Sequence, residues 1–226
     1  MKYLLQKEFV LFKEKNIIKY SGKCDYTEVS INDLKLIDNK NSLIPIGSVE
    51  FVRKYCELNH ILLPNIKCYP DDFSFLNRKI SVKKFSEVLD YEFVKPQRIK
   101  AFTGNIKSRI DEPVNSNELC WVSEPLTFDC EFRVYILNNK IIGYSQYDDS
   151  EDSSWNPSEF AEKILLKCPL NIMGYSIDVG LVDGKETLIE FNDGWSLGFY
   201  NYGTMTEKSY IDLITARWIQ ILANAN

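Results

Sequence analysis

Two β-hairpin signals in the second half of the chain constrain its fold more than any other feature. Alternating runs within residues 131–147 (EFRVYILNNKIIGYSQY) meet at Asn138-Asn139, and residues 175–192 (YSIDVGLVDGKETLIEFN) turn at Asp183-Gly184. Asn, Asp and Gly accept the positive φ that tight hairpin turns need. Helical patterns accompany both hairpins, at residues 156–167 and 207–225, with Asn156 and Thr206 as expected N-caps and Pro157 at the first helical position. Antiparallel hairpins mixed with helices predict an α+β fold.

The first third of the chain predicts a separate small α/β unit. Strand-like runs occupy residues 3–12 and 28–37, and a helix is expected over residues 49–58 with Ser48 as its cap. With 45% apolar residues among 226, the chain can bury a core in each part. We therefore expect an N-terminal α/β domain over residues 1–75 and a second domain over residues 76–226.

Charge, cysteines and histidine exclude several classes of function. A net charge of -5 and a pI near 5.1 argue against a dedicated nucleic-acid binder. No apolar run approaches the roughly 18 residues of a membrane span, and the N-terminus lacks secretory-signal features. The six cysteines form no CxxC pair, which argues against zinc and disulfides and favours a cytoplasmic protein. The single histidine, His60, argues against a Ser-His-Asp mechanism.

The second hairpin carries an unusual pair of acids. Glu190 and Asn192 share one face of their strand, and Asp178 shares a face with Ser176 on the partner strand. A two-residue loop would place Asp178 and Glu190 on opposite faces, whereas a three-residue loop through Lys185, or an equivalent bulge, places them opposite each other. We expect the second register, which suits Mg²⁺. The alternative is an ordinary exposed strand with two acids.

That register leads to a prediction about the stability of the metal-free fold. Two carboxylates facing each other repel unless a counter-ion lies between them. Neutralising Asp178 and Glu190 together is therefore expected to leave the metal-free fold intact.

A basic segment and a charged strand precede this hairpin. Residues 93–109 (FVKPQRIKAFTGNIKSR) contain no acid, place Lys95 at the end of an apolar strand and include a Thr103-Gly104 turn whose amides could approach phosphate. A solvated basic loop or a nucleic-acid contact is the alternative. Glu131 and Arg133 share one strand face, either as a surface ion pair or as ligands of a ribose hydroxyl and a developing negative charge. The acidic run at residues 147–152 is a solvated loop or a lid.

Five short segments occur in an order that resembles the ATP-grasp superfamily. They are FVKP, VSEPL, EFRVYI, SIDVG and LIEFNDG, and the resemblance covers about residues 76–226. It is strongest to the small bacterial and phage ATP-grasp proteins proposed to act as peptide ligases. The resemblance implies an ATP-grasp fold, in which two α+β subdomains hold ATP between them.

The resemblance also implies roles for individual residues. Lys95 and Lys100 would contact the nucleotide phosphates, the Thr103-Gly104 turn would close over them, and Glu131 would bind the ribose. The hinge around the adenine would comprise Val122, Glu124 and Leu126. The Mg²⁺ ligands, for one or two ions, would be Asp178, Glu190 and Asn192. The loop at residues 194–198 would lie beside the acceptor substrate.

The implied reaction joins a carboxylate to an amine through an acylphosphate, giving an amide, ADP and phosphate. Lys95 and Arg133 would offset charge on the transferring group. The expected partners are a small-molecule or peptide carboxylate and an amine acceptor, with no membrane involved. An ATP-dependent phosphotransferase and a non-catalytic nucleotide-binding module are the alternatives.

Three features depart from the family pattern, and one of them is the glycine-rich loop, which is reduced here to Thr103-Gly104. Ser176 stands where many of these ligases carry an arginine, so Arg133 is the expected substitute. An early lysine is also common in the family, and here Arg78 and Lys79 are the candidates.

Overall fold

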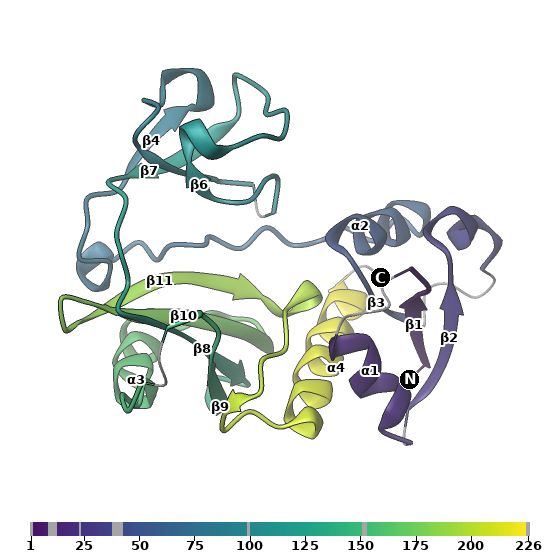
Figure 1. Ribbon diagram of the computed structural model, residues 1–226. Helices are drawn as coiled ribbons and strands as arrows, with labels where there is room; N and C mark the ends of the chain where they lie inside the picture. Colours follow the sequence, from purple (N-terminus) through teal and green to yellow (C-terminus); the bar gives the residue numbers. More distant parts are fainter. Residues whose placement is uncertain are drawn as a thin grey trace.

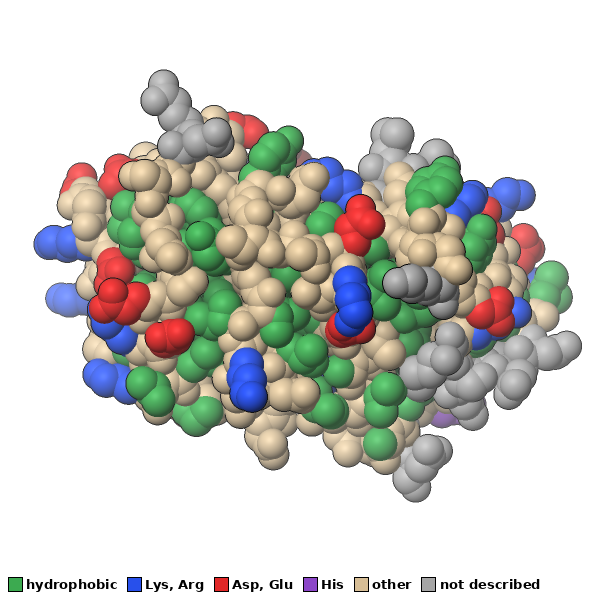
Figure 2. Space-filling view, turned by 90° about the horizontal axis from the view of Figure 1, so that it is seen from below, with side chains coloured by type: hydrophobic (Ala, Val, Ile, Leu, Met, Phe, Trp, Pro, Cys, Tyr) green, Lys and Arg blue, Asp and Glu red, His purple; other side chains and the backbone are tan. Residues whose placement is uncertain are grey.

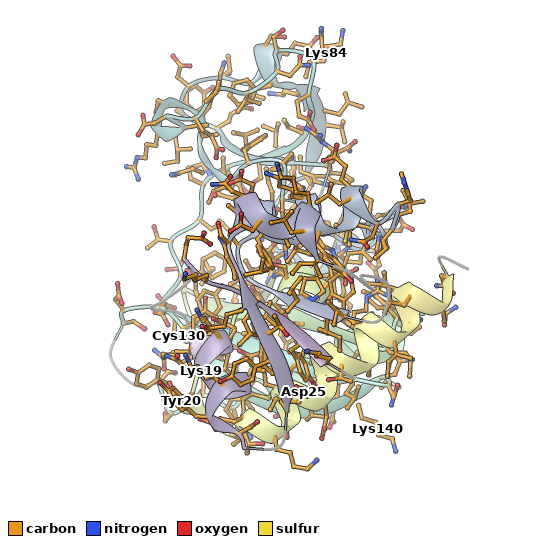
Figure 3. All side chains as sticks on the ribbon, turned by 90° about the vertical axis from the view of Figure 1, so that its right-hand side faces the viewer. Lys19, Tyr20, Asp25, Lys84, Cys130 and Lys140 are labelled. Carbon is orange, nitrogen blue, oxygen red and sulfur yellow. The ribbon has the colours of Figure 1, made fainter. Side chains whose placement is uncertain are left out.

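The computed structural model describes residues 2–8, 13–22, 24–37, 43–98, 100–150 and 153–224. These residues form three sheets, which Figure 1 shows as an N-terminal unit, a small sheet and a larger central sheet. In Figure 3, Lys84 marks the outer end of the small sheet, well apart from Lys19 and Asp25 of the N-terminal unit. No helix in the described part of the chain combines the length and apolar character needed to cross a bilayer.

The N-terminal unit is a three-stranded parallel sheet flanked by two helices. Strands β1 (Lys2–Gln6), β2 (Asp25–Val29) and β3 (Leu43–Ile46) pair in the order β2-β1-β3, with α1 (Lys13–Tyr20) and α2 (Val49–Leu58) alongside. The predicted helix over residues 49–58 is confirmed, and Ser48 caps it by accepting a 3.1 Å hydrogen bond from Phe51 N.

Both strands predicted in this unit are shorter than expected. The run at residues 28–37 is strand only to Val29, and a 3₁₀ helix, η1 (Ile31–Leu36), follows because Ser30 caps it by accepting from Asn32 N. Asn and Asp side chains favour such turns over extended backbone. Strand β1 ends at Gln6, and residues 9–12 of the predicted first strand lie outside the described residues.

The small sheet stands above the central one in Figure 1. Its antiparallel strands run in the order β4-β7-β5-β6. Their bounds are β4 (Ser81–Lys84), β5 (Phe93–Pro96), β6 (Asn105–Ile106) and β7 (Leu119–Ser123). The small sheet has its own core of buried side chains, comprising Val88, Val94, Phe102, Cys120 and Val122.

The central sheet has five antiparallel strands in the order β11-β10-β8-β9-β12. Their bounds are β8 (Cys130–Leu137), β9 (Lys140–Gln146), β10 (Gly174–Val182), β11 (Lys185–Asp193) and β12 (Tyr202–Gly203). Both predicted hairpins are present, and all four turn residues have positive φ, at 52° and 58° for Asn138 and Asn139 and 50° and 71° for Asp183 and Gly184.

Two helices cover the lower side and end of this sheet. Helix α3 (Ser158–Lys167) lies beneath it, and α4 (Glu207–Asn224) lies between it and the N-terminal unit (Figure 1). The cap predicted at Thr206 is confirmed, since Thr206 accepts a hydrogen bond from Ser209 N. The start predicted for α3 is wrong by one residue: Pro157 is its N-cap and not its first helical residue, and Asn156 accepts a hydrogen bond from Ser158 N just before the helix. The predicted final residue of the last helix, Ala225, lies outside the described residues. On the face that Figure 2 shows, seen from below, charged side chains are scattered among apolar and polar ones.

A β-bulge sets the register of the second hairpin. The loop itself is two residues long, because Val182 pairs with Lys185. The register then shifts between Asp178 and Val179, so that Ile189 is an extra residue in β11. As a result Asp178 lies opposite Glu190, and Ser176 lies opposite Asn192. The predicted register is therefore confirmed, and the bulge rather than a three-residue loop produces it.

Candidate active site

A cavity of about 630 Å³ lies between the small sheet and the central sheet. Nine of the predicted site residues line it: Lys95, Lys100, Thr103, Gly104, Glu124, Leu126, Glu131, Glu190 and Asn192. Three others do not. Val122 is 1% exposed in the core of the small sheet, and Arg133 and Asp178 lie behind the cavity wall.

Asp178 is held in a buried network rather than exposed to the cavity. The Arg133 guanidinium donates two hydrogen bonds to its carboxylate, at 2.9 and 2.7 Å, and Asn192 Nδ2 donates a third at 2.9 Å. Burial opposes the charge on Arg133, but Asp178 holds the pKa of that guanidinium above its ordinary value. The rings of Tyr147 and Tyr200 also lie 5.6 and 5.2 Å from the guanidinium carbon. Arg133 therefore serves to fix Asp178.

Glu190 has a different counter-ion. Lys95 reaches from β5 across the cavity and its ammonium donates to Glu190 Oε2, so this ion pair links the two sheets. Burial lowers the pKa of Lys95, an effect that Cys68 and Asp178 partly offset. The two facing carboxylates, for which no protein counter-ion was expected, thus each pair with a cation from a different strand.

The hydrogen-bond partner of Glu131 is a tyrosine that no sequence pattern had indicated. Tyr147 donates a 2.6 Å hydrogen bond to Glu131 Oε2. Burial raises the pKa of the Glu131 carboxyl, and the bond from Tyr147 partly offsets that rise. The surface ion pair between Glu131 and Arg133, which was the structural alternative, is not formed. A second register shift, between Tyr135 and Ile136, brings Tyr147 opposite Glu131, and a uniform hairpin would not.

Lys100 joins the small sheet to the loop that follows β11. Its ammonium donates to the Ser196 carbonyl and lies 4.2 Å from the centre of the Trp195 ring. Its backbone φ of 58° is in the left-handed region, which disfavours residues with a Cβ. Burial lowers the pKa of Lys100 to about 7. A lysine held in this way can change its charge near neutral pH.

Other cavity residues were missed or left open. Between Arg78 and Lys79, it is Arg78 that lines the cavity, where it stacks on Tyr69 and donates to the carbonyls of Leu188 and Ile189. Cys68 and Tyr69 belong to the extended connection after α2, and Cys68 O accepts from Phe191 N at 2.8 Å. No local sequence signal marks this connection as part of a site.

The oxygen donors at the cavity fit a hard cation. Glu190 and Asn192 line the cavity and offer a carboxylate and an amide oxygen, a donor set that suits Mg²⁺. Asp178 lies opposite Glu190, but both of its oxygens are engaged by Arg133. Among the described residues there is no cluster of three or more His, Cys, Asp or Glu side chains that could hold a metal alone. The arrangement therefore fits an ion that takes its other ligands from water and substrate.

The small sheet and the central sheet thus close on a cavity in which Lys95 of one sheet pairs with Glu190 of the other. Residues 75–212 match the model of the family described as ATP-grasp domain, R2K clade family 2. The chain belongs to this family, which confirms the resemblance and the ATP-grasp fold. No curated protein matches the chain.

Solved structures align with this chain over 65% to 100% of its length. D-alanine–D-alanine ligase from Bacillus anthracis aligns over 100% of both chains with a TM-score of 0.50 and 10% identity. A RimK domain ATP-grasp protein from Sphaerobacter thermophilus DSM 20745 covers 99% of this chain and 98% of its own, with a TM-score of 0.47 and 10% identity. The ATP-grasp ligase PsnB, complexed with a minimal precursor, aligns over 65% of this chain and 56% of its own, with a TM-score of 0.42 and 16% identity.

Proposed function

We propose that this chain is an ATP- and Mg²⁺-dependent ligase that joins a carboxylate to an amine and releases ADP and phosphate. Membership of the ATP-grasp family supports the use of ATP. The observation that carries the proposal is the cavity between the sheets, where Lys95 of one sheet faces Glu190 of the other. A phosphate tail and its metal ion need cations and hard oxygen donors together in this way.

The walls of the cavity suggest how the nucleotide is held. Lys95 and Lys100 would contact phosphate oxygens, and the Thr103-Gly104 turn would cover them. Glu124 and Leu126 would meet the adenine, and Glu131, already oriented by Tyr147, would accept from a ribose hydroxyl. Val122 does not line the cavity and would act only by packing the strand that leads to this hinge.

Glu190 and Asn192 would hold the magnesium ion, with Asp178 behind them. Bound Mg²⁺ would neutralise phosphate charge and polarise the phosphoryl group that is transferred. Arg133 was predicted to stabilise the transferring group directly, but its guanidinium is occupied by Asp178. We therefore assign it the positioning of Asp178, and assign to Lys95 the charge stabilisation at the phosphoryl group.

The reaction needs no side-chain nucleophile. A substrate carboxylate oxygen bonds to the γ-phosphorus while the bond from that phosphorus to the β-phosphate oxygen breaks, and ADP leaves. The amine nitrogen then bonds to the acyl carbon, the carbon–oxygen bond to phosphate breaks, and the amine proton passes to the departing phosphate. The protein's part is to position the reactants, exclude water and balance charge.

The test measures ADP formation by the purified chain with ATP, Mg²⁺ and a library of carboxylates, each with and without amines. ADP release that requires both substrates, with a product mass equal to their sum minus water, supports the ligase. A stable phosphorylated product from a single substrate would instead identify a phosphotransferase. ATP binding with no ADP formed in any mixture would identify a non-catalytic module.

Two variants connect the activity to the cavity. Glu190→Gln should abolish ADP formation, whereas Glu186→Gln, on the same strand but outside the cavity, should retain it. Lys95→Ala should weaken ATP binding measured by calorimetry, because it removes a cation from the cavity. Full turnover in Glu190→Gln would remove that residue from the mechanism.

A further inference from the structure

The outer edge of β11 is covered by the connection that follows α2. Strand β11 lies at one end of the strand order of the central sheet, and the backbone groups on the outer edge of such a strand need partners from elsewhere. Figure 1 shows the extended connection running alongside this strand. Phe191 N donates to Cys68 O at 2.8 Å, and Asn77 Nδ2 donates to Glu186 O at 2.8 Å. The connection therefore binds β11 on both sides of the bulge at Ile189.

Arg78 binds the bulge itself. Its Nη1 donates to Leu188 O and its Nη2 donates to Ile189 O, both at 3.0 Å, and Nη1 also donates to Leu76 O at 3.1 Å. In a regular strand neighbouring carbonyls point to opposite edges, so one side chain at the edge could not bond to both. The extra residue at Ile189 breaks that alternation, and two successive carbonyls reach the same edge. The planar guanidinium, with its fork of donors, matches such a pair.

The bulge decides which side chains of β11 face the cavity. Continued from the two-residue loop without an extra residue, the pairing would set Asp178 opposite Ile189 and turn Glu190 to the other face of the sheet. With the bulge, Glu190 lies opposite Asp178, and Glu190 and Asn192 both line the cavity. A group that stabilises the bulge therefore also sets the direction of these two oxygen donors.

The guanidinium of Arg78 is committed to these backbone contacts, although Arg78 lines the cavity. Its bonds to three carbonyls use both terminal nitrogens, and its carbon lies 5.4 Å from the centre of the Tyr69 ring. A direct contact with a nucleotide phosphate would have to break the bonds to the bulge. The contacts present thus favour a role in holding β11 over a role in binding phosphate.

We propose that Arg78 is a positioning residue for the metal site: it holds the Leu188 and Ile189 carbonyls at the bulge and so keeps Glu190 and Asn192 turned toward the cavity. The proposal rests on the magnesium site proposed above and adds a residue that acts on that site through β11. Lysine would not replace Arg78, since an ammonium is a point donor and two carbonyls side by side require a fork.

The first test is amide hydrogen exchange of the full chain, without nucleotide and with a metal chelator. Arg78→Met removes the donors and keeps an unbranched side chain. We expect peptides covering residues 186–193 to exchange at least about tenfold faster than in the wild type, because hydrogen bonds from a charged group are lost. Peptides covering β8 and β9 should keep their rates. Lys67→Met removes a cation from the same connection, where Lys67 pairs with the exposed Asp71, and should exchange like the wild type.

The second test measures binding of a non-hydrolysable ATP analogue by calorimetry, with Mg²⁺ and with the chelator. Arg78→Met should lose at least about tenfold in affinity with Mg²⁺ and no more than about threefold without it, because only the magnesium complex uses Glu190 and Asn192. Arg78→Lys keeps the charge but should still lose at least about threefold with Mg²⁺. Lys67→Met should bind like the wild type, and thermal unfolding checks that each variant is folded.

Three outcomes would overturn the assignment. One is unchanged exchange over residues 186–193 in both Arg78 variants. Another is an equal loss of affinity with and without Mg²⁺ that Arg78→Lys restores, which would identify a phosphate contact. The third is a wild type whose affinity does not respond to Mg²⁺, since no cation then depends on these side chains.

Neither test of Arg78 needs turnover, so its result is separate from that of the ligase. Failure of the ADP-release test with both expected shifts present would reject the ligase and keep the role of Arg78. ADP release with unchanged exchange in the Arg78 variants would keep the ligase and reject the role of Arg78.

Discussion

Replacement of Asp178 by asparagine tests whether the buried network holds the central sheet together. Asp178 is 1% exposed, and Arg133 donates to it at 2.9 and 2.7 Å. Asparagine keeps the shape but leaves the guanidinium buried without a counter-ion, which costs about 3–5 kcal/mol. The retained amide oxygen and the flanking Tyr147 and Tyr200 rings favour the lower end. A loss of about 3 kcal/mol lowers the melting temperature of a chain of this length by about 6–12 °C.

The assay is thermal unfolding followed by circular dichroism in buffer containing a metal chelator. Asp71→Asn is the matched control, because it breaks an exposed ion pair with Lys67 and should leave the melting temperature unchanged. A fall of less than about 2 °C for Asp178→Asn would refute the reasoning. From the sequence alone we expect the opposite, because Asp178 and Glu190 then face each other as mutually repelling charges. The structure replaces that expectation by pairing each with its own cation.

Two further predictions concern Lys100 and the loop after β11. Burial lowers the pKa of Lys100 to about 7 from an ordinary value of 10.5, so the unfolded chain binds more protons between these values and the free energy of unfolding should rise with pH across that window. Lys100→Met should flatten this rise in urea titrations, and an identical slope in the variant would contradict it. At Gly194 an added Cβ would lie 2.5 Å from the backbone oxygen of Gly174, whereas at Gly198 it would lie 3.3 Å from Arg133 Nη1. Gly194→Ala should therefore lower the melting temperature clearly more than Gly198→Ala, and equal melting temperatures would show that the loop can move.

The elements around the cavity could be predicted because their signals are local. The turns at Asn138-Asn139 and Asp183-Gly184 need positive φ, and Asn, Asp and Gly are the residue types that accept it. The pairing of Asp178 with Glu190 was predictable for another reason. Only one of the two possible registers places Asp178 on the same sheet face as Glu190 and Asn192, where the three side chains can act together. How the chain reaches that register, through a bulge at Ile189, depends on packing and has no local signal.

The partners of the site residues could not be predicted, because they come from distant parts of the chain. Lys95 and Glu190 are 95 residues apart, and Arg133 and Asp178 are 45 apart. An acid and an arginine two residues apart, Glu131 and Arg133, looked like partners of each other. In the structure Glu131 accepts a hydrogen bond from Tyr147 and Arg133 donates to Asp178, because the neighbouring strands bring those groups closer. The order of the strands in the sheets thus decides which charged residues form ion pairs, and hairpin signals alone do not determine that order.

The charges in the large cavity give a physical reason for the acid and amide pattern of β11. Three cationic and four acidic side chains line it: Arg78, Lys95, Lys100, Glu112, Glu124, Glu131 and Glu190. A polyphosphate entering this space would take Lys95 from Glu190, and the freed carboxylate would face phosphate at close range. That repulsion is strong in a half-buried site, so a divalent cation is required for both to stay. Asn192 supplies the adjacent oxygen without charge and also donates to Asp178, where a third carboxylate would add to the repulsion. The same residues therefore suit both the closed ion pairs described here and a site that opens to a metal-bound nucleotide.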